Sequence, residues 1–177
     1  MGGGLELALS CDYRIGTRRS QFRFPETSIG IYPGLGGTQR TARICGLECS
    51  RYAILAGNFL DSVTAHDLGL LTHNVDPTEV DSVVSSLIGT KPDNKYTFRP
   101  ANEVSKVVDF SKKFYSDTNI GALLEGEIPS GFDPDDPMVS RQVKALSRGA
   151  PIALRIASEL LSYATNGSSL EDGLKLE

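Results

Sequence analysis

Two glutamates and a run of glycines near the start of the chain are residue types suited to a site that moves protons. The glycines at 2–4 lead into an apolar stretch that contains Glu6. The first N–H groups of a helix have no partner within it, so the amide of Gly3 is a candidate donor to a ligand's carbonyl oxygen. Helical side chains lean toward the amino terminus, so we expect the Glu6 carboxylate to point to the same place.

The second carboxylate, Glu26, follows Pro25 where a predicted strand ends and a loop begins. Two carboxylates from separate elements can flank one small molecule. Such a pair adds or removes water when one side takes a proton and the other gives one. Neighbouring negative charges also raise one of the two pKa values, which keeps an acid form available near neutral pH.

Each of these features also has a plain structural explanation. Glu6 is an acid near a helix start, with Arg14 and Arg40 as candidate ion-pair partners, and glycines also form tight turns. The glycine-rich run from Gly34 to Gly37 is a candidate phosphate loop. It lacks the lysine of the Walker motif and the spacing of a dinucleotide-binding loop, which argues against that interpretation.

The composition is that of a globular protein and excludes several classes. Hydrophobic residues make up 40% and charged residues 23%, which is ordinary for a chain that buries a core. The net charge of −4 argues against a broad nucleic-acid-binding surface. No stretch resembles an export signal or approaches the ~18 apolar residues of a membrane helix. We therefore expect no nucleic-acid partner, no membrane association and a cytoplasmic location.

The cysteines show neither a disulfide framework nor a metal-binding pattern. Cys11, Cys45 and Cys49 are odd in number, and Gly46 is expected to break the helix between the last two. Structural zinc usually takes four ligands, and two histidines are too few to complete such a set. We expect free thiols and no metal.

Hydrophobic periodicity, glycine and proline indicate the elements that position the two glutamates. The predicted helices lie at about 5–11, 38–45, 48–56, 64–68, 79–88, 102–115 and 151–164. The predicted strands lie at about 13–17, 21–24 and 70–75, with a loop over 26–37. The first helix is apolar on nearly every side, which predicts full burial. Thr78 is expected to cap the helix at 79–88, Pro151 to begin the long helix, and Ser168 with Glu171 to form a capping box for a last helix.

Changes in composition and in predicted secondary structure divide the chain into three segments. Residues 1–88 alternate strands and helices, residues 89–137 combine a helical stripe with linkers rich in proline and aspartate, and residues 138–177 are helical.

The run GGGLELALSCD followed by FRFPETSIGIYPGLGGTQR resembles the crotonase superfamily of acyl-CoA enzymes, and within it the enoyl-CoA hydratases. AGNFLDSVTAHDLGLLTHNV and APIALRIASELL resemble later segments of the same family. The resemblance implies an α/β fold, a partial ββα spiral followed by a helical C-terminal region, assembled as a trimer or hexamer. Residues 89–137 resemble inserts of archaeal-type proteins in which a hydratase is fused to a 3-hydroxyacyl-CoA dehydrogenase.

The resemblance also implies an activity, hydration of trans-2-enoyl-CoA to 3-hydroxyacyl-CoA as in fatty acid beta-oxidation. Glu6 would help to activate water, and Glu26 would exchange the proton at the α-carbon. The Gly3 amide would stabilise the thioester oxyanion, and Gly34 would line the acyl end of the pocket. No separate cofactor is expected, since CoA is part of the acyl-CoA substrate.

Other members of the superfamily remain as alternatives. Isomerases typically keep an acid at the position of Glu26 without needing the first one, and 3-hydroxyisobutyryl-CoA hydrolases share a Pro-Glu-Thr loop but typically lack the acid matching Glu6. In the family a second oxyanion donor comes from a segment upstream of the glycine run. We therefore expect a chain truncated at both ends, inactive by itself, and a catalytically silent module is the further alternative.

Overall fold

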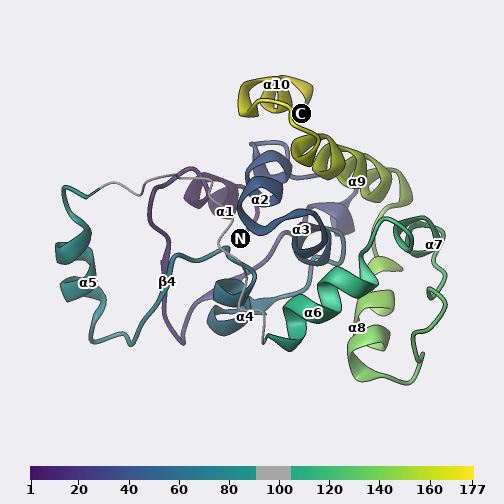
Figure 1. Ribbon diagram of the computed structural model, residues 1–177, viewed down its shortest axis with the longest axis horizontal. Coiled ribbons are helices and arrows are strands. Elements are labelled where there is room, and N and C mark those ends of the chain that lie inside the picture. The colour runs from purple at the N-terminus through teal and green to yellow at the C-terminus, as the bar shows by residue number, and fades with distance from the viewer. Residues whose placement is uncertain (91–104) are drawn as a thin grey trace.

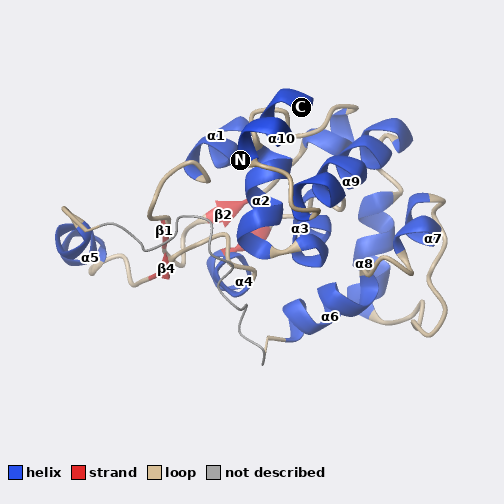
Figure 2. Cartoon of the chain, turned by 45° about the horizontal axis from the view of Figure 1, so that its top comes forward, coloured by secondary structure: helices blue, strands red, loops and turns tan. Residues whose placement is uncertain are grey.

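The computed structural model describes residues 1–90 and 105–177. Helices dominate these residues, and the strands are short (Figures 1 and 2). The helices before residue 90 are α1 (Gly3–Ala8), α2 (Gly37–Cys45), α3 (Leu47–Ile54), α4 (Ser62–Asp67) and α5 (Val80–Leu87), with a 3-10 turn η1 at Glu26–Ile29. The later helices are α6 (Lys106–Phe114), α7 (Ile120–Leu124), α8 (Pro137–Leu146), α9 (Pro151–Thr165) and α10 (Leu170–Leu176). Most of the expected linker at 89–101 and the start of the stripe at 102–115 lie outside the described residues.

Two small sheets join strands that are distant from each other within residues 1–88. β1 (Ile15–Gly16) pairs in parallel with β4 (His73–Asn74), and β2 (Gln21–Phe22) pairs antiparallel with β3 (Leu60–Asp61). The first pairing is extended by Arg14, whose backbone N–H donates to Thr72 Oγ1 at 2.7 Å. The strands predicted at 13–17, 21–24 and 70–75 are confirmed in shortened form. β3 was not predicted, because two residues are too few for an alternating pattern.

The centre of the molecule is formed by α2, α3 and α9. α2 packs along α9 and beside α3 (Figure 1). Gly36 and Gly46 flank α2 with φ of 87° and 78°, values that glycine adopts without strain, so the predicted break at Gly46 is confirmed. The buried side chains that these helices share with their neighbours include Leu9, Phe24, Ile54, Leu55, Leu68 and Leu161.

α1 is shorter and less buried than its sequence suggests. It ends at Ala8, with Leu5 and Leu9 buried and Leu7 70% exposed. The prediction of a helix buried on all sides is therefore wrong. Leu5 and Leu9 are four residues apart and lie on one face, whereas Leu7 lies on the opposite face.

The residues between 105 and 137 pack into the common core. Five rings from this range and from α3 form an aromatic cluster of Tyr52, Phe110, Phe114, Tyr115 and Phe132. Phe114 is fully buried, 4.8 Å from the Phe110 ring centroid and 4.9 Å from that of Phe132. The three-segment division stays a prediction, and these contacts join its middle segment to the first.

Helix starts test the capping predictions directly. Pro151 is the first residue of α9, as expected. The capping box of α10 is shifted by one residue, because Ser169 Oγ, not Ser168, accepts the backbone N–H of Asp172 at 3.0 Å. The cap at Thr78 is also wrong: Thr78 donates to Asp76 Oδ1, and Glu79 stands at the N-cap of α5. α7 was not predicted, and α8 lies in the segment from residue 138 that was expected to be helical but was given no bounds of its own.

Candidate active site

Glu6 is held at the amino terminus of α2. Its side chain, in the first turn of α1, is buried. Its Oε2 accepts the backbone N–H groups of Leu35 at 2.7 Å and Gly37 at 2.8 Å. Gly37 is the first residue of α2, where partial positive charge stabilises an anion. The carboxylate is thus fixed by backbone groups. The candidate partner Arg40 donates instead to Leu35 O at 2.8 Å.

Gly37 leaves the space that this arrangement requires. A Cβ atom at this position would lie 2.6 Å from Glu6 Oε2 and equally close to Pro33 Cβ. Two N–H groups of the glycine-rich run therefore bind a side chain of the same protein, which explains the run without a phosphate. The sequence reasoning missed Leu35 and Gly37 as partners of Glu6.

Glu26 lies against Gly2, the glycine that precedes α1. It is the first residue of η1 and is buried. Its Oε1 would be 2.9 Å from a Cβ atom at Gly2, whose φ of 56° also requires glycine. Among the described residues, its Oε2 is buried without a hydrogen-bond partner. Glu26 therefore has one carboxylate oxygen with unused acceptor capacity, unlike Glu6 Oε2.

Burial shifts both carboxyl groups toward the acid form. Burial raises the pKa of Glu6, and the N–H donors of Leu35 and Gly37 act against this rise. Burial also raises the pKa of Glu26, and the negative charge of Glu6 raises it further. The structure thus brings the two predicted carboxylates within electrostatic reach of each other, and both favour the protonated form more than an exposed glutamate does.

The two glycines predicted to bind substrate lie on the elements that carry this site. Gly3 is the first residue of α1, so its N–H has no acceptor within the helix. Gly34 precedes the turn that holds Glu6, and a Cβ atom there would lie 3.5 Å from the Tyr32 ring. The roles of Gly3, Gly34, Glu6 and Glu26 in binding and catalysis stay predictions.

Sequence reasoning also missed Glu177, which binds the same turn from another direction. Its carboxylate accepts the N–H of Gly36 at 2.5 Å, the N–H of Gln39 at 3.3 Å and the hydroxyl of Thr38. No local pattern indicates these contacts, because the partners are far apart in the chain.

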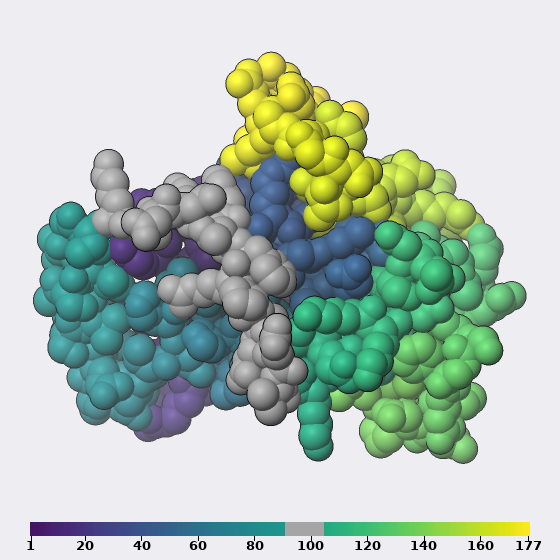
Figure 3. Space-filling model, in the orientation of Figure 1, coloured from purple at the N-terminus to yellow at the C-terminus, as the bar shows by residue number. Residues whose placement is uncertain are grey.

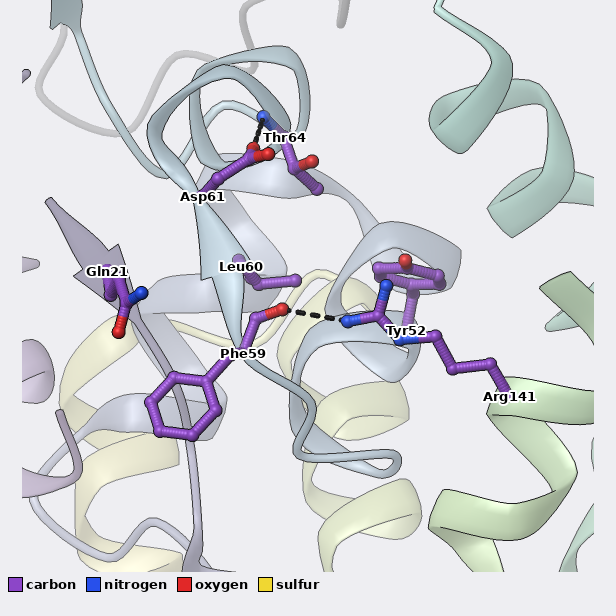
Figure 4. A pocket seen from close by; sticks show the side chains of 7 residues that line it. All are labelled: Gln21, Tyr52, Phe59, Leu60, Asp61, Thr64 and Arg141. Atoms are coloured by element: carbon purple, nitrogen blue, oxygen red, sulfur yellow. Dashed lines mark hydrogen bonds between the residues drawn. The ribbon is translucent and has the colours of Figure 1, made fainter. Parts of the chain in front are cut away.

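A separate cavity of about 200 Å³ lies between β3, α4 and α8 (Figure 4). Two of its polar side chains already have partners in the protein: Arg141 donates to Phe59 O at 3.0 Å, and Asp61 accepts the N–H of Thr64 at 2.7 Å. None of its lining residues is a predicted site residue.

The cysteines are free thiols, and Cys11 is exposed. Cys45 and Cys49 are buried free thiols, and burial raises the pKa of Cys49 to about 12. Within residues 1–90 and 105–177, no three histidine, cysteine or acidic side chains gather as they would around a metal ion. In the same residues, every helix falls short of the length and apolar character that crossing a membrane requires.

Known proteins resemble this chain in sequence and in fold. An enoyl-CoA isomerase/hydratase of Mycosarcoma maydis is 50% identical over 74 residues, 41% of this chain and 27% of that protein. A peroxisomal fatty acid beta-oxidation multifunctional protein of Arabidopsis thaliana is 41% identical over 80 residues, 45% of this chain and 11% of that protein. An enoyl-CoA hydratase structure from Rhodobacter sphaeroides superposes with a TM-score of 0.74 at 23% identity.

That superposition covers 99% of this chain and 50% of the solved structure, so the chain spans about half the length of this relative. It confirms the expected α/β fold of a partial crotonase-like spiral followed by helices. The family model described as enoyl-CoA hydratase/isomerase matches residues 1–177. The chain therefore belongs to the enoyl-CoA hydratase/isomerase family of the crotonase superfamily.

Proposed function

We propose that Glu6 and Glu26 are the proton-transferring pair of an enzyme that adds water to trans-2-enoyl-CoA thioesters. The observation that carries this proposal is the asymmetry of two neighbouring buried carboxylates. Glu6 Oε2 is fixed by two backbone amides, whereas Glu26 Oε2 is buried without a partner among the described residues. A buried acceptor without a partner is costly, and a water molecule or a substrate proton would satisfy it.

In this proposal each residue of the site has a separate role in the reaction. The thioester oxygen lies at the Gly3 N–H, which stabilises the negative charge that develops there, as in other oxyanion holes. Glu6 takes a proton from the water that attacks C3, and Glu26 gives a proton to C2. The product is the 3-hydroxyacyl-CoA, which gains one hydroxyl group and one hydrogen. Gly34 lines the acyl end of the pocket.

The raised pKa values support such a division. A group transfers protons best when its pKa lies near the working pH, and burial moves both glutamates in that direction. After one turnover Glu6 holds the proton taken from water and Glu26 has lost one. The pair as a whole therefore keeps its number of protons, and the starting state returns when a proton passes from Glu6 to Glu26. No metal or separate cofactor takes part in this scheme.

The presence of two acids favours hydration over isomerisation. An isomerase moves one proton between carbons and needs one acid or base, whereas hydration needs a group that activates water as well. The relative from Mycosarcoma maydis carries both activities in its name, so isomerisation is the second candidate. The multifunctional relative is consistent with a linked 3-hydroxyacyl-CoA dehydrogenase as a partner. That partner, a trimeric or hexameric assembly and a cytoplasmic location stay predictions.

Hydration of crotonyl-CoA by a version extended to the length of the solved relatives tests the proposal. We expect Glu26→Gln and Glu6→Gln each to lower the rate by about 10²–10⁴-fold, the usual contribution of a positioned acid or base. Glu171→Gln, on the exposed face of α10, is the matched control and should keep the rate. Near-normal activity in both site variants would refute the pair.

A further inference from the structure

The turn between Pro33 and α2 is bound by two carboxylates at once. Glu6 accepts the N–H groups of Leu35 and Gly37. Glu177 accepts the N–H of the residue between them, Gly36, and also that of Gln39. The amides of three consecutive residues therefore alternate between the two carboxylates. The φ of 87° at Gly36 belongs to the left-handed region that glycine favours.

Glu177 is committed to this turn. Its carboxylate also accepts the hydroxyl of Thr38, a residue that is fully buried. The ion pairs of the described residues do not include Glu177, so its recorded side-chain partners all belong to the start of α2. Two or more donors at a helix start are a strong combination for one carboxylate.

Contacts along α10 hold the Glu177 side chain in this position. α10 packs on α2 and α9, and the yellow carboxyl-terminal residues lie against the blue residues of α2 in Figure 3. Arg43 of α2 fixes the start of α10 by donating to Ser168 O at 2.8 Å and Ser169 O at 2.9 Å. Tyr32 fixes the other end, since its hydroxyl donates to Glu177 O at 2.7 Å. α10 is thus held at both ends on the elements that carry the turn.

We infer that Glu177 is a positioning residue for Glu6: by holding the Gly36 amide, it orients the turn so that the Leu35 and Gly37 amides face the Glu6 carboxylate. This inference rests on the proposed function, in which Glu6 activates water. Glu177 acts through the turn and touches no reacting atom. α10 thereby contributes to the geometry of a glutamate that is far from it in the sequence.

Amide hydrogen exchange, measured by NMR on the 177-residue chain, tests the inference. The decisive amides are those of Leu35 and Gly37, which donate to Glu6 and do not contact the Glu177 carboxylate. In Glu177→Ala we expect both to exchange about tenfold faster, the scale set by losing charged hydrogen bonds that hold a local structure closed. Glu177→Gln keeps one acceptor oxygen and should restore part of the protection. Glu171→Gln, on the same helix, should leave both amides unchanged.

A purely structural role for Glu177 gives a different pattern. Gly36 and Gln39 would then exchange faster in Glu177→Ala while Leu35 and Gly37 kept their protection, which would overturn the inference. If the alanine variant does not fold, the glutamine variant decides, since faster exchange at Leu35 and Gly37 is still expected there and unchanged exchange contradicts it. Amide exchange needs no substrate, so its outcome is independent of the hydration assay. A failed hydration assay would refute the proposed function, whereas unchanged exchange at Leu35 and Gly37 would refute the positioning role of Glu177.

Discussion

Two buried clusters in this molecule are held together by different forces. The glutamate site, formed by Glu6, Glu26 and the turn at 33–38, is held by backbone N–H groups that donate to carboxylates. The aromatic cluster around Phe114 is held by ring contacts between α3, α6 and the residues before α8. Burying rings releases free energy, whereas burying carboxylates costs free energy unless hydrogen bonds replace their hydration.

The comparison separates stability from chemistry. The aromatic cluster has no charged member, so its substitutions should act on the free energy of unfolding. The glutamate site contains a buried oxygen without a partner among the described residues, which a domain selected for stability alone would avoid. Its substitutions should change reactivity more than stability, and some should stabilise the fold.

Phe114→Ala has the largest expected effect on stability. The side chain is fully buried between two other rings, so we expect the free energy of unfolding to fall by about 3–5 kcal/mol, as for other buried phenylalanines. Chemical denaturation monitored by circular dichroism measures this change.

The matched control is Phe59→Ala, because Phe59 is 50% exposed and its recorded ring contact is with Arg23 at 5.0 Å. We expect it to cost at most about 1 kcal/mol, the scale of an exposed cation–π contact. Equal losses from the two variants would show that the aromatic cluster is not the stabilising region.

Gly37→Ala should disturb the glutamate site by a smaller amount. The added methyl group would meet Glu6 Oε2 and Pro33 Cβ at 2.6 Å, so one of them must move, at a cost of about 1–3 kcal/mol. The control is Gly121→Ala in α7, where a Cβ atom meets nothing within 4 Å. Replacing a helical glycine without a clash should stabilise the chain by about 0.5–1 kcal/mol. Thermal unfolding of both variants should shift in opposite directions, and a shared direction would contradict the packing described here.

The dependence of stability on pH gives the smallest of these effects. The pKa of Glu26 is raised in the folded state above its ordinary value of 4.5, mainly by burial. In the window above that value the folded state holds more protons than the unfolded state, so the free energy of unfolding falls as pH rises. Below the window both states are protonated and the penalty disappears.

Glu26→Gln removes this titrating group, so the variant should gain stability over the wild type as pH rises through the window. At lower pH this gain in the free energy of unfolding should disappear. Urea denaturation across a pH series measures the difference. If the difference in free energy of unfolding between Glu26→Gln and the wild type stays constant from acid to neutral pH, burial does not raise the pKa of Glu26.

The two regions also differ in how far the sequence alone predicts them. Local signals predicted Glu6 near a helix start and Glu26 where a strand gives way to a loop. Only the family resemblance implied that the two act together. The partners of Glu6 at Leu35 and Gly37, and the contacts of Glu177, depend on tertiary packing that one sequence does not display. Likewise β3 was too short to recognise, and the stretch before α8 has a linker's composition although Phe132 within it joins the core.

The helix boundaries show the same limit on a smaller scale. Gly46 and Pro151 were located correctly, since each acts through its own backbone conformation. The cap of α10 was misplaced by one residue, because adjacent serines have the same propensity and only the orientation of the incoming chain selects Ser169. Local chemistry thus fixes where an element can end, and packing decides among neighbouring positions.

One isotope experiment tests the central claim most directly. The extended protein is incubated with crotonyl-CoA in water enriched in oxygen-18 and deuterium, and the products are weighed by mass spectrometry. We predict a 3-hydroxyacyl-CoA that carries solvent oxygen at C3 and solvent deuterium at C2, formed at least about 10²-fold more slowly by Glu26→Gln. A deuterated enoyl-CoA without solvent oxygen, or release of free CoA, would contradict hydration by this pair.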